Sequence, residues 1–245
     1  MSEAAMGLWG ERPMVVIDFE TTGQSPQGGG RATEIAMVRV HRGEIQDHFQ
    51  SLMFTGVAIT PFVRQLTGID EAMLESAPAA AQVMAQALEF AHNCGLVAHN
   101  AAFDRSVWAA ELQHAGLAGP TLPVPEFACT VRLSRKLYPE SPNCKLGTLA
   151  QYHQLPAHGR AHRALADALT TAELLLRVQQ DLAQQFQTQL QDLPVSHELL
   201  ARLQAVALPQ WPRCVAGYVQ SVRRTQAQID TSQSVLCADR TQSAC

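Results

Sequence analysis

The feature that most constrains the fold is the stretch VVIDFETTG at residues 15–23, an apolar run that carries two carboxylates. A run of this kind is typical of a buried strand. Residues two apart on an extended strand point to the same side, so Asp18 and Glu20 are expected about 7 Å apart on one face. Burying two like charges costs several kcal/mol per charge unless a cation lies between them. The stretch therefore predicts a divalent metal site, although an edge strand with both charges in water also fits the pattern.

Size and composition limit the class of protein. The 245 residues suffice for one α/β domain with an appendage, and the apolar fraction of 47% predicts a core that needs no disulfide or metal to hold it together. Six scattered cysteines without a C-x-x-C pair indicate reduced thiols and a cytoplasmic protein. No segment has the character of a signal peptide or a membrane span, so we expect no membrane contact. The net charge of -4 argues against coating of long duplex nucleic acid, but it permits a pocket that grips one chain end beside a bound metal.

The chain divides into a leader at residues 1–12, a domain at 13–185, a partly helical extension at 186–224, and a polar tail at 225–245 that we expect to be disordered. Strands are predicted at residues 15–20, 31–40, 49–54 and 95–100, and helices at 62–68, 79–94, 104–115, 146–152, 164–191 and 196–206. Residues 126–137 indicate a short strand that runs into a helix. Together these patterns predict an α/β fold.

The strand predicted at residues 95–100 is followed at once by a helix, and the segment HNAAFD at 99–104 spans the junction. Open α/β sheets tend to bind ligands at the carboxyl ends of their strands, which is where this segment lies. Asp104 falls in the first helical turn, so it could serve a ligand site or simply cap the helix.

Candidate reactive residues lie at the ends of the predicted core elements: Asp18, Glu20, Asp104, Asp167 and His162. Five residues turn a helix by about 140°, so His162 and Asp167 can share one site only if His162 lies in the loop before the helix. Oxygen ligands of this kind suit Mg²⁺ or Mn²⁺. Two such ions about 4 Å apart can hold an attacking water and a leaving 3′ oxygen on opposite sides of one phosphorus, and a histidine has the pKa to take the water proton.

Three blocks of the sequence resemble a known family. The segments DFETTG at 18–23, HNAAFD at 99–104 and HRALAD at 162–167 are similar to exonuclease motifs I, II and III of the DEDDh 3′-to-5′ exonucleases. This DnaQ-like, ribonuclease H-like group includes the epsilon proofreading subunit of bacterial DNA polymerase III, ribonuclease T and oligoribonuclease. The segment LTGI at 66–69 also resembles epsilon-like members, and the likeness covers about residues 13–180. It implies a mixed central sheet of about five strands flanked by helices, with a helical C-terminal extension.

The resemblance also implies roles for individual residues. Two Mg²⁺ or Mn²⁺ ions would be held by Asp18, Glu20, Asp104 and Asp167, with His162 as the general base. The residues expected near the substrate are Thr21, Thr22, Gly23, Leu66, Phe103, His99 and Asn100. Without the resemblance, Leu66 and Phe103 could equally be core residues, and His99 is better explained as a buried histidine whose hydrogen bonds are satisfied.

These features favour a metal-dependent exonuclease that removes nucleoside 5′-monophosphates from single-stranded DNA 3′ ends, in proofreading or repair. The LTGI segment favours DNA over RNA, and an RNA or oligoribonucleotide exonuclease is the alternative. A second class is a partner-docking module, whose C-terminal extension binds a polymerase or clamp through the weakly clamp-peptide-like segment 187–193. A binding protein without catalysis is disfavoured, because all five reactive positions hold competent residue types.

Overall fold

The computed structural model describes residues 12–23, 25–119 and 124–242, and the leader expected at residues 1–12 falls outside this part except for its last residue. Its strands are β1 (Met14–Thr21), β2 (Ala32–His41), β3 (Glu44–Leu52), β4 (Gly95–Ala98) and β5 (Phe127–Cys129). Its helices are η1 (Pro26–Gly28), α2 (Pro61–Thr67), α3 (Glu71–Glu75), α4 (Ala80–Phe90), α5 (Ala101–His114), α6 (Thr130–Leu137), α7 (Leu146–Tyr152), α8 (Ala164–Gln185), α9 (Gln187–Leu190), α10 (His197–Ala205), η2 (Leu208–Gln210) and α11 (Trp211–Gln242).

The five strands form one mixed sheet in the order β3-β2-β1-β4-β5, which confirms the predicted fold class. β1, β2 and β3 form an antiparallel meander, whereas β4 and β5 run parallel to β1. The carboxyl ends of β1, β4 and β5 therefore meet at the same edge of the sheet. This edge is where the motif residues of β1 and of the β4–α5 junction lie together.

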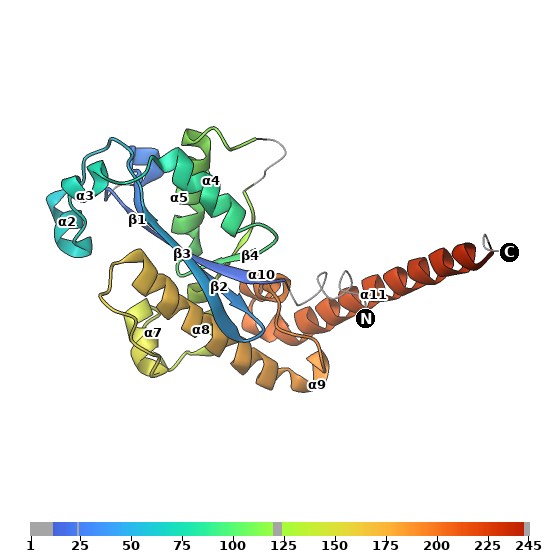
Figure 1. Cartoon of the computed structure of the whole chain (residues 1–245). Helices are drawn as coiled ribbons and strands as arrows, with labels where there is room; N and C mark the ends of the chain where they lie inside the picture. Colours follow the sequence, from blue (N-terminus) through green and yellow to red (C-terminus); the bar gives the residue numbers. More distant parts are fainter. Residues whose placement is uncertain (1–11, 24, 120–123, 243–245) are drawn as a thin grey trace.

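The sheet separates two apolar cores because its central strands alternate sides. Along β1, Met14 and Val16 belong to the core under α8, whereas Val15, Ile17 and Phe19 belong to the core under α4 and α5. Figure 1 shows α4 and α5 on one side of the sheet and α7 and α8 on the other. Asp18 and Glu20 continue the Met14–Val16 side of the strand, so both carboxylates face the layer that contains α8.

Several predicted boundaries differ from the structure: the helix expected at 79–94 ends at Phe90, the helix expected at 104–115 begins at Ala101, and two further differences have a clear physical cause. β3 begins at Glu44 rather than at residue 49, because Arg42 and Gly43, both with positive φ, close a tight hairpin after β2. The polar first half of β3 is exposed at the sheet edge, which removes the apolar alternation that would have revealed it. The helix expected at 164–191 is interrupted at Phe186, which leaves helical geometry and packs against Trp211 with ring centroids 6.4 Å apart.

The extension expected at residues 186–224 is part of the main core rather than an appendage. Its buried apolar residues share one cluster with α8: Phe186, Leu190, Val195, Leu199, Leu200, Leu203, Trp211, Val215, Tyr218, Val219 and Val222. The Gln204 side chain accepts a hydrogen bond from the Cys129 N–H at 2.7 Å and donates to the Phe127 carbonyl at 3.0 Å. It thereby pairs with the open edge of β5 as a neighbouring strand would.

The tail expected to be disordered from residue 225 is instead helical as far as Gln242, as the last part of α11. After Gly217 the chain contains no glycine or proline, so nothing in the sequence interrupts a helix there. Figure 1 shows this part of α11 extending away from the body of the molecule.

Two expectations about the whole chain concern cysteines and membranes. Cys94, Cys129, Cys144 and Cys214, the cysteines whose side chains are described, are all free thiols. Across the described residues, no helix combines the length and the apolar character needed to cross a bilayer.

We predict that truncation after residue 185 abolishes cooperative folding, whereas truncation after residue 230 leaves the free energy of unfolding nearly unchanged. Losing one buried leucine side chain costs about 2–5 kcal/mol, and the shorter chain loses several from a total stability of about 5–15 kcal/mol. Urea unfolding followed by circular dichroism measures both. A chain ending at residue 185 that unfolds with the full-length midpoint would contradict the shared core.

Candidate active site

The β1 strand positions the first two carboxylates. Asp18 pairs with Ala36 and Glu20 with Glu34 in the antiparallel register with β2, and the register then shifts so that Thr21 pairs with Ala32. Because the strand remains extended through Glu20, both acids lie on one face, as the sequence predicted. The shift directly after Glu20 ends the regular ladder and starts the turn that follows.

Asp104 comes from the first turn of α5 and is 2% exposed. Its Oδ1 accepts a hydrogen bond from the backbone N–H of Phe19 at 3.2 Å. This carboxylate therefore joins the start of α5 to the strand residue between Asp18 and Glu20. The N-cap position of α5 belongs to Asn100, in left-handed geometry and without a side-chain cap bond.

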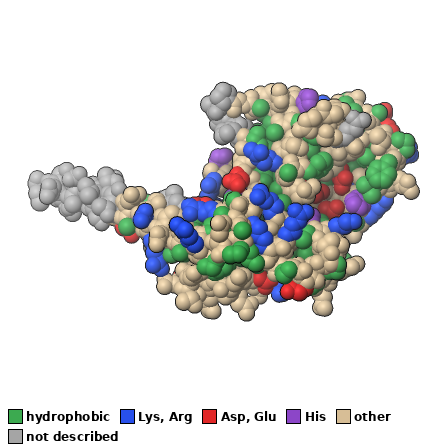
Figure 2. Space-filling view, turned by 180° about the vertical axis from the view of Figure 1, so that it is seen from behind, with side chains coloured by type: hydrophobic (Ala, Val, Ile, Leu, Met, Phe, Trp, Pro, Cys, Tyr) green, Lys and Arg blue, Asp and Glu red, His purple; other side chains and the backbone are tan. Residues whose placement is uncertain are grey.

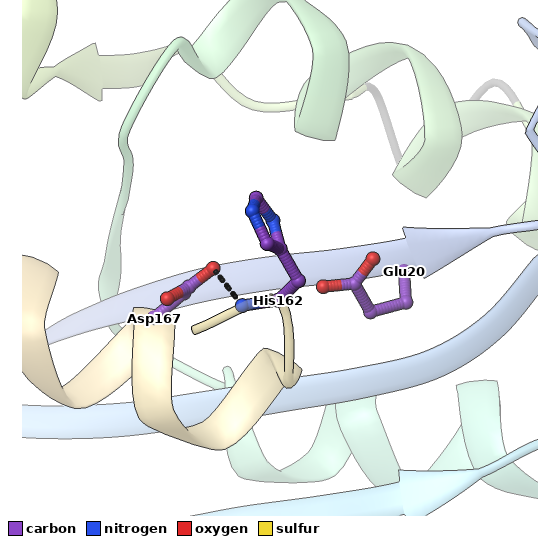
Figure 3. A group of neighbouring side chains, drawn as sticks. All are labelled: Glu20, His162 and Asp167. Atoms are coloured by element: carbon purple, nitrogen blue, oxygen red, sulfur yellow. Dashed lines mark hydrogen bonds between the residues drawn. The ribbon is translucent and has the colours of Figure 1, made fainter. Parts of the chain in front are cut away.

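His162 and Asp167 come from the other side of the sheet. His162 is exposed in the loop before α8, with a φ of 62°, and Asp167 lies in the first turn of α8. The His162 N–H donates to Asp167 Oδ2 at 3.1 Å. Candidate ligand atoms of Glu20, His162 and Asp167 lie within 4.8 Å of one another, and Figure 3 shows His162 between the two carboxylates. The predicted placement of His162 in the loop agrees with this geometry.

The electrostatics of the cluster follow from burial and like charge. Burial, reinforced by repulsion from the neighbouring acids, first among them Asp104, raises the pKa of Asp18 well above its usual range. Burial also raises the pKa of Asp104 to about 8, and that of Glu20 to about 7 with repulsion from Asp167 as the next cause. The pKa of Asp167 is raised by burial against the opposing hydrogen bond from the His162 N–H.

This donor set fits hard divalent cations. The four acids present carboxylate oxygens, which Mg²⁺ and Mn²⁺ prefer, and their mutual repulsion is what a bound cation relieves. Protein cations relieve little of this repulsion. Arg163 lowers the pKa of Glu20, but its guanidinium forms an ion pair with a different carboxylate. The site thus has oxygen ligands for a cation but little positive charge from the protein to balance them.

The partner of Arg163 is Glu34, a residue that sequence reasoning missed. Glu34 is fully buried in β2 and accepts two hydrogen bonds from the Arg163 guanidinium, at 3.1 and 2.7 Å. Its Oε2 also accepts the Ala164 N–H at 3.1 Å. The start of α8, directly after His162, is therefore anchored to the strand opposite Glu20. A lone acid within the apolar run of residues 32–40 was the available signal.

A second anchor of the same design fixes the turn after β1. Arg31 donates two hydrogen bonds of 2.9 Å to the buried carboxylate of Glu111, which also accepts the Ala32 N–H. Thr22, which is 4% exposed, bonds to the Arg31 backbone through both its N–H and its hydroxyl. The Thr22 hydroxyl is thus committed within the protein, and the Thr21 hydroxyl oxygen accepts the Gly23 N–H at 3.3 Å.

Helix α2 packs closely against the turn at residues 21–23. Gly23 has a φ of 100°, and a Cβ there would lie 2.7 Å from Val63. The close approach therefore requires glycine. Helix α2 begins with Thr60 accepting the Val63 N–H and ends at Gly68, whose φ is 75°. Leu66 is half-buried on this helix, as expected for a residue beside a ligand rather than in the core.

Phe103 and His99 differ in their surroundings. Phe103 is 37% exposed, which disfavours the alternative that it is a core residue. His99 Nε2 lies 3.0 Å from the Cys144 carbonyl and Nδ1 lies 2.8 Å from the Thr130 hydroxyl. Since a carbonyl only accepts, Nε2 carries the proton, and burial lowers the pKa of His99 to about 4. Both ring nitrogens are used within the protein, so His99 has a structural role, and its expected contact with substrate stays a prediction.

Comparison with known proteins agrees with this geometry. The model of the exonuclease family RNase_T matches residues 15–175. The chain belongs to this exonuclease family. It is 37% identical over 180 residues to the PolC-type DNA polymerase III of Caldanaerobacter subterraneus subsp. tengcongensis, a match covering 74% of this chain and 12% of that one. It is 32% identical over 171 residues to the DNA polymerase III subunit epsilon of Aquifex aeolicus, covering 69% of this chain and 81% of that one.

Solved exonuclease structures share the fold. Exonuclease X in complex with 5′ overhanging duplex DNA is 29% identical, with a TM-score of 0.54 over 68% of this chain and 91% of that one. The nuclease domain of 3′hExo, a DEDDh family member bound to rAMP, is 22% identical, with a TM-score of 0.58 over 70% and 93% of the two chains, and supports the fold alone. The chain spans about an eighth of the PolC-type relative, so activity and partners are inferred below from its own residues.

We predict that, without divalent metal, the thermal unfolding midpoint falls between about pH 5 and about pH 8. Carboxyl groups with a raised folded-state pKa keep protons that the unfolded chain loses above about pH 4, so their stabilising effect is lost as the pH rises through about 7 for Glu20 and about 8 for Asp104. Mg²⁺ should raise the midpoint more at the higher pH. Differential scanning calorimetry measures the profile, and Asp104→Asn should flatten it. The same slope in both proteins would refute the assignment.

We predict that Glu34→Ala destabilises the chain by about 3 kcal/mol and lowers turnover, because it leaves Arg163 and the Ala164 N–H without their acceptor. Glu198→Ala breaks the exposed pair with Arg202 and serves as the matched control, with an expected loss below about 1 kcal/mol. Chemical unfolding and steady-state kinetics provide the measurements. Equal losses in the two variants would show that Glu34 is not an anchor.

Proposed function

We propose that the chain is a metal-dependent 3′-to-5′ exonuclease that removes nucleoside 5′-monophosphates from single-stranded DNA ends. The observation that carries this proposal is the convergence of β1, α5 and the loop before α8 on one group of acids with an exposed histidine. Repulsion from Asp104, Glu20 and Asp167 contributes to the raised pKa of Asp18, which supports a common site for the four acids. The family match of residues 15–175 supports the same reaction class.

Two Mg²⁺ or Mn²⁺ ions would be held by Asp18, Glu20, Asp104 and Asp167. When bound, such ions supply positive charge beside the scissile phosphate and favour deprotonation of the attacking water. The protein's own contribution is rigidity. Asp104 is fixed to β1 through the Phe19 N–H, and Asp167 is fixed to the His162 backbone, so the carboxylates need little rearrangement to bind.

His162 is the proposed general base. His162 is exposed and lies between Glu20 and Asp167 (Figure 3), so it is open to a water beside the carboxylates. The hydrogen bond from its own N–H to Asp167 fixes the backbone, so the ring remains free to accept a proton. His99 cannot substitute for it, because both its ring nitrogens are occupied.

The terminal nucleotide is proposed to bind in the turn at residues 21–23, between Leu66 of α2 and Phe103 of α5. Apolar and aromatic side chains pack against any base, which suits removal of nucleotides regardless of sequence. Preference for DNA rests on the LTGI segment and on the relatives named as DNA polymerase III components. An RNA exonuclease uses the same chemistry, so substrate competition decides between the two.

We propose that a polymerase or clamp binds the part of α11 that follows Val222. The segment at residues 187–193 is a poor docking peptide, because Leu190 is 1% exposed and Leu193 packs against the core. Among the residues of α11 whose side chains are described, which end at residue 230, Val222 is the last one in the core, and the helix continues for twenty residues beyond it. Co-purification of a replication polymerase or clamp with the full chain, lost on truncation after residue 230, tests the docking role.

We predict Mg²⁺-dependent shortening of a 5′-labelled single-stranded DNA from its 3′ end, with nucleoside 5′-monophosphate products and no reaction in chelator. Matched RNA and mismatched-primer substrates run in parallel determine the substrate class. Asp18→Asn should lower the rate by orders of magnitude, because it removes one of the metal-binding charges.

His162→Ala provides the second arm of this test. A lost general base lowers turnover by about 10²–10⁴ while Mn²⁺ binding, measured by calorimetry, is retained. Equal loss of bound metal would identify His162 as a ligand instead. Undiminished hydrolysis by Asp18→Asn would refute the proposed site.

A further inference from the structure

A groove of about 1140 Å³ opens from the candidate active site. It begins at His162 and Asp167 and continues between α6 and α7. Ligand pockets typically measure about 300–1000 Å³, so this groove has room for more than one small ligand. The basic, amide and hydroxyl side chains in its lining belong to Arg135, Asn143, Lys145, Thr148, Gln151 and Asn100.

The lining of the groove carries charges of both signs. Asp167 is the one carboxylate in it, whereas Arg135 and Lys145 supply two exposed cations. Within the part of the chain that the structure describes, neither cation forms an ion pair. Figure 2 shows Lys and Arg side chains gathered on one face beside a hollow in which acidic side chains are visible.

Other cations close to the site are already engaged. Arg31 and Arg163 bind buried carboxylates, and Arg160 donates to the carbonyls of Gln65 and Leu66. Lys136, the neighbour of Arg135, donates to three carbonyl oxygens at the end of α10. Arg135 and Lys145 therefore differ from these residues in having charge available for a ligand.

We infer that this groove binds the phosphodiester backbone of the nucleotides on the 5′ side of the scissile bond, with Arg135 and Lys145 contacting their phosphates. The inference rests on the proposed function. His162 and Asp167 belong to the candidate active site and also line the groove, so a strand that leaves the site can continue into the groove. Amide and hydroxyl side chains in the lining can donate to sugar and phosphate oxygens, which fixes register without reading bases.

Binding of a fluorescent oligothymidylate in chelator, followed by anisotropy across a salt series, tests the inference without hydrolysis. The double variant Arg135→Ala, Lys145→Ala should bind on the order of tenfold more weakly, and the slope of log affinity against log salt should fall by about 0.7 per cation removed. Arg132→Ala is the matched control, since Arg132 is exposed on the same helix but does not line the groove. An unchanged slope in the double variant would overturn the inference.

A kinetic comparison separates the groove from the proposed function. The p-nitrophenyl ester of thymidine 5′-monophosphate has a terminal nucleoside and no upstream phosphate. The ratio of kcat/KM for the oligothymidylate to that for the ester should fall on the order of tenfold in the double variant, and an unchanged ratio would count against the groove. If the unsubstituted chain hydrolyses neither substrate with Mg²⁺, the proposed function fails, and the salt slope still decides whether the groove binds the strand.

Discussion

Repulsion among carboxylates that are buried or half-buried is the constraint on which the rest of this structure depends. Burial raises the pKa of all four acids of the site, Asp18, Glu20, Asp104 and Asp167, and repulsion from neighbouring acids adds to this for the first three. The folded chain therefore holds an arrangement that its own charges oppose. Such an arrangement persists only if the surrounding elements over-determine it. The sheet does this through β1, which fixes two of the acids by strand geometry alone, while hydrogen bonds to backbone amides fix the acids that come from helices.

Two buried carboxylate–arginine anchors stabilise the segments that the strand does not fix. Glu34 binds Arg163 and the next amide, and Glu111 binds Arg31 and the next amide, each in the same bidentate arrangement. The first fixes the start of α8 beside His162, and the second fixes the turn at residues 21–23. Because both arginines are paired with acids outside the cluster, they neutralise little of its charge, although Arg163 lowers the pKa of Glu20. The design keeps structural charge pairs separate from the charges that a metal would neutralise.

Local patterns of the sequence predicted most of the fold and the positions of several candidate site residues. Alternation along residues 15–20 predicted the shared face of Asp18 and Glu20, and helical periodicity placed His162 in a loop. The pairing of Glu34 with Arg163 joins residues 129 apart, and no local period reports such a contact. The packing of the extension into the core was missed for the same reason. Gln204 is polar, so the sequence does not mark it as buried, yet its side chain forms hydrogen bonds with the backbone at the edge of β5. The edge half of β3 was missed because exposure removes apolar alternation.

The C-terminal extension also supports one wall of the groove. Lys136 follows Arg135 on α6 and closes the end of α10 through three carbonyl contacts, and Gln204 on α10 pairs with β5, the strand that leads into α6. The orientation of α6 is therefore set from both ends by α10. The position of a side chain on the outer face of α6 therefore depends on α10 even where that side chain does not contact the extension. The helices after residue 185 thus position part of the strand-binding surface, which gives them a functional reason to be built into the core rather than attached to it.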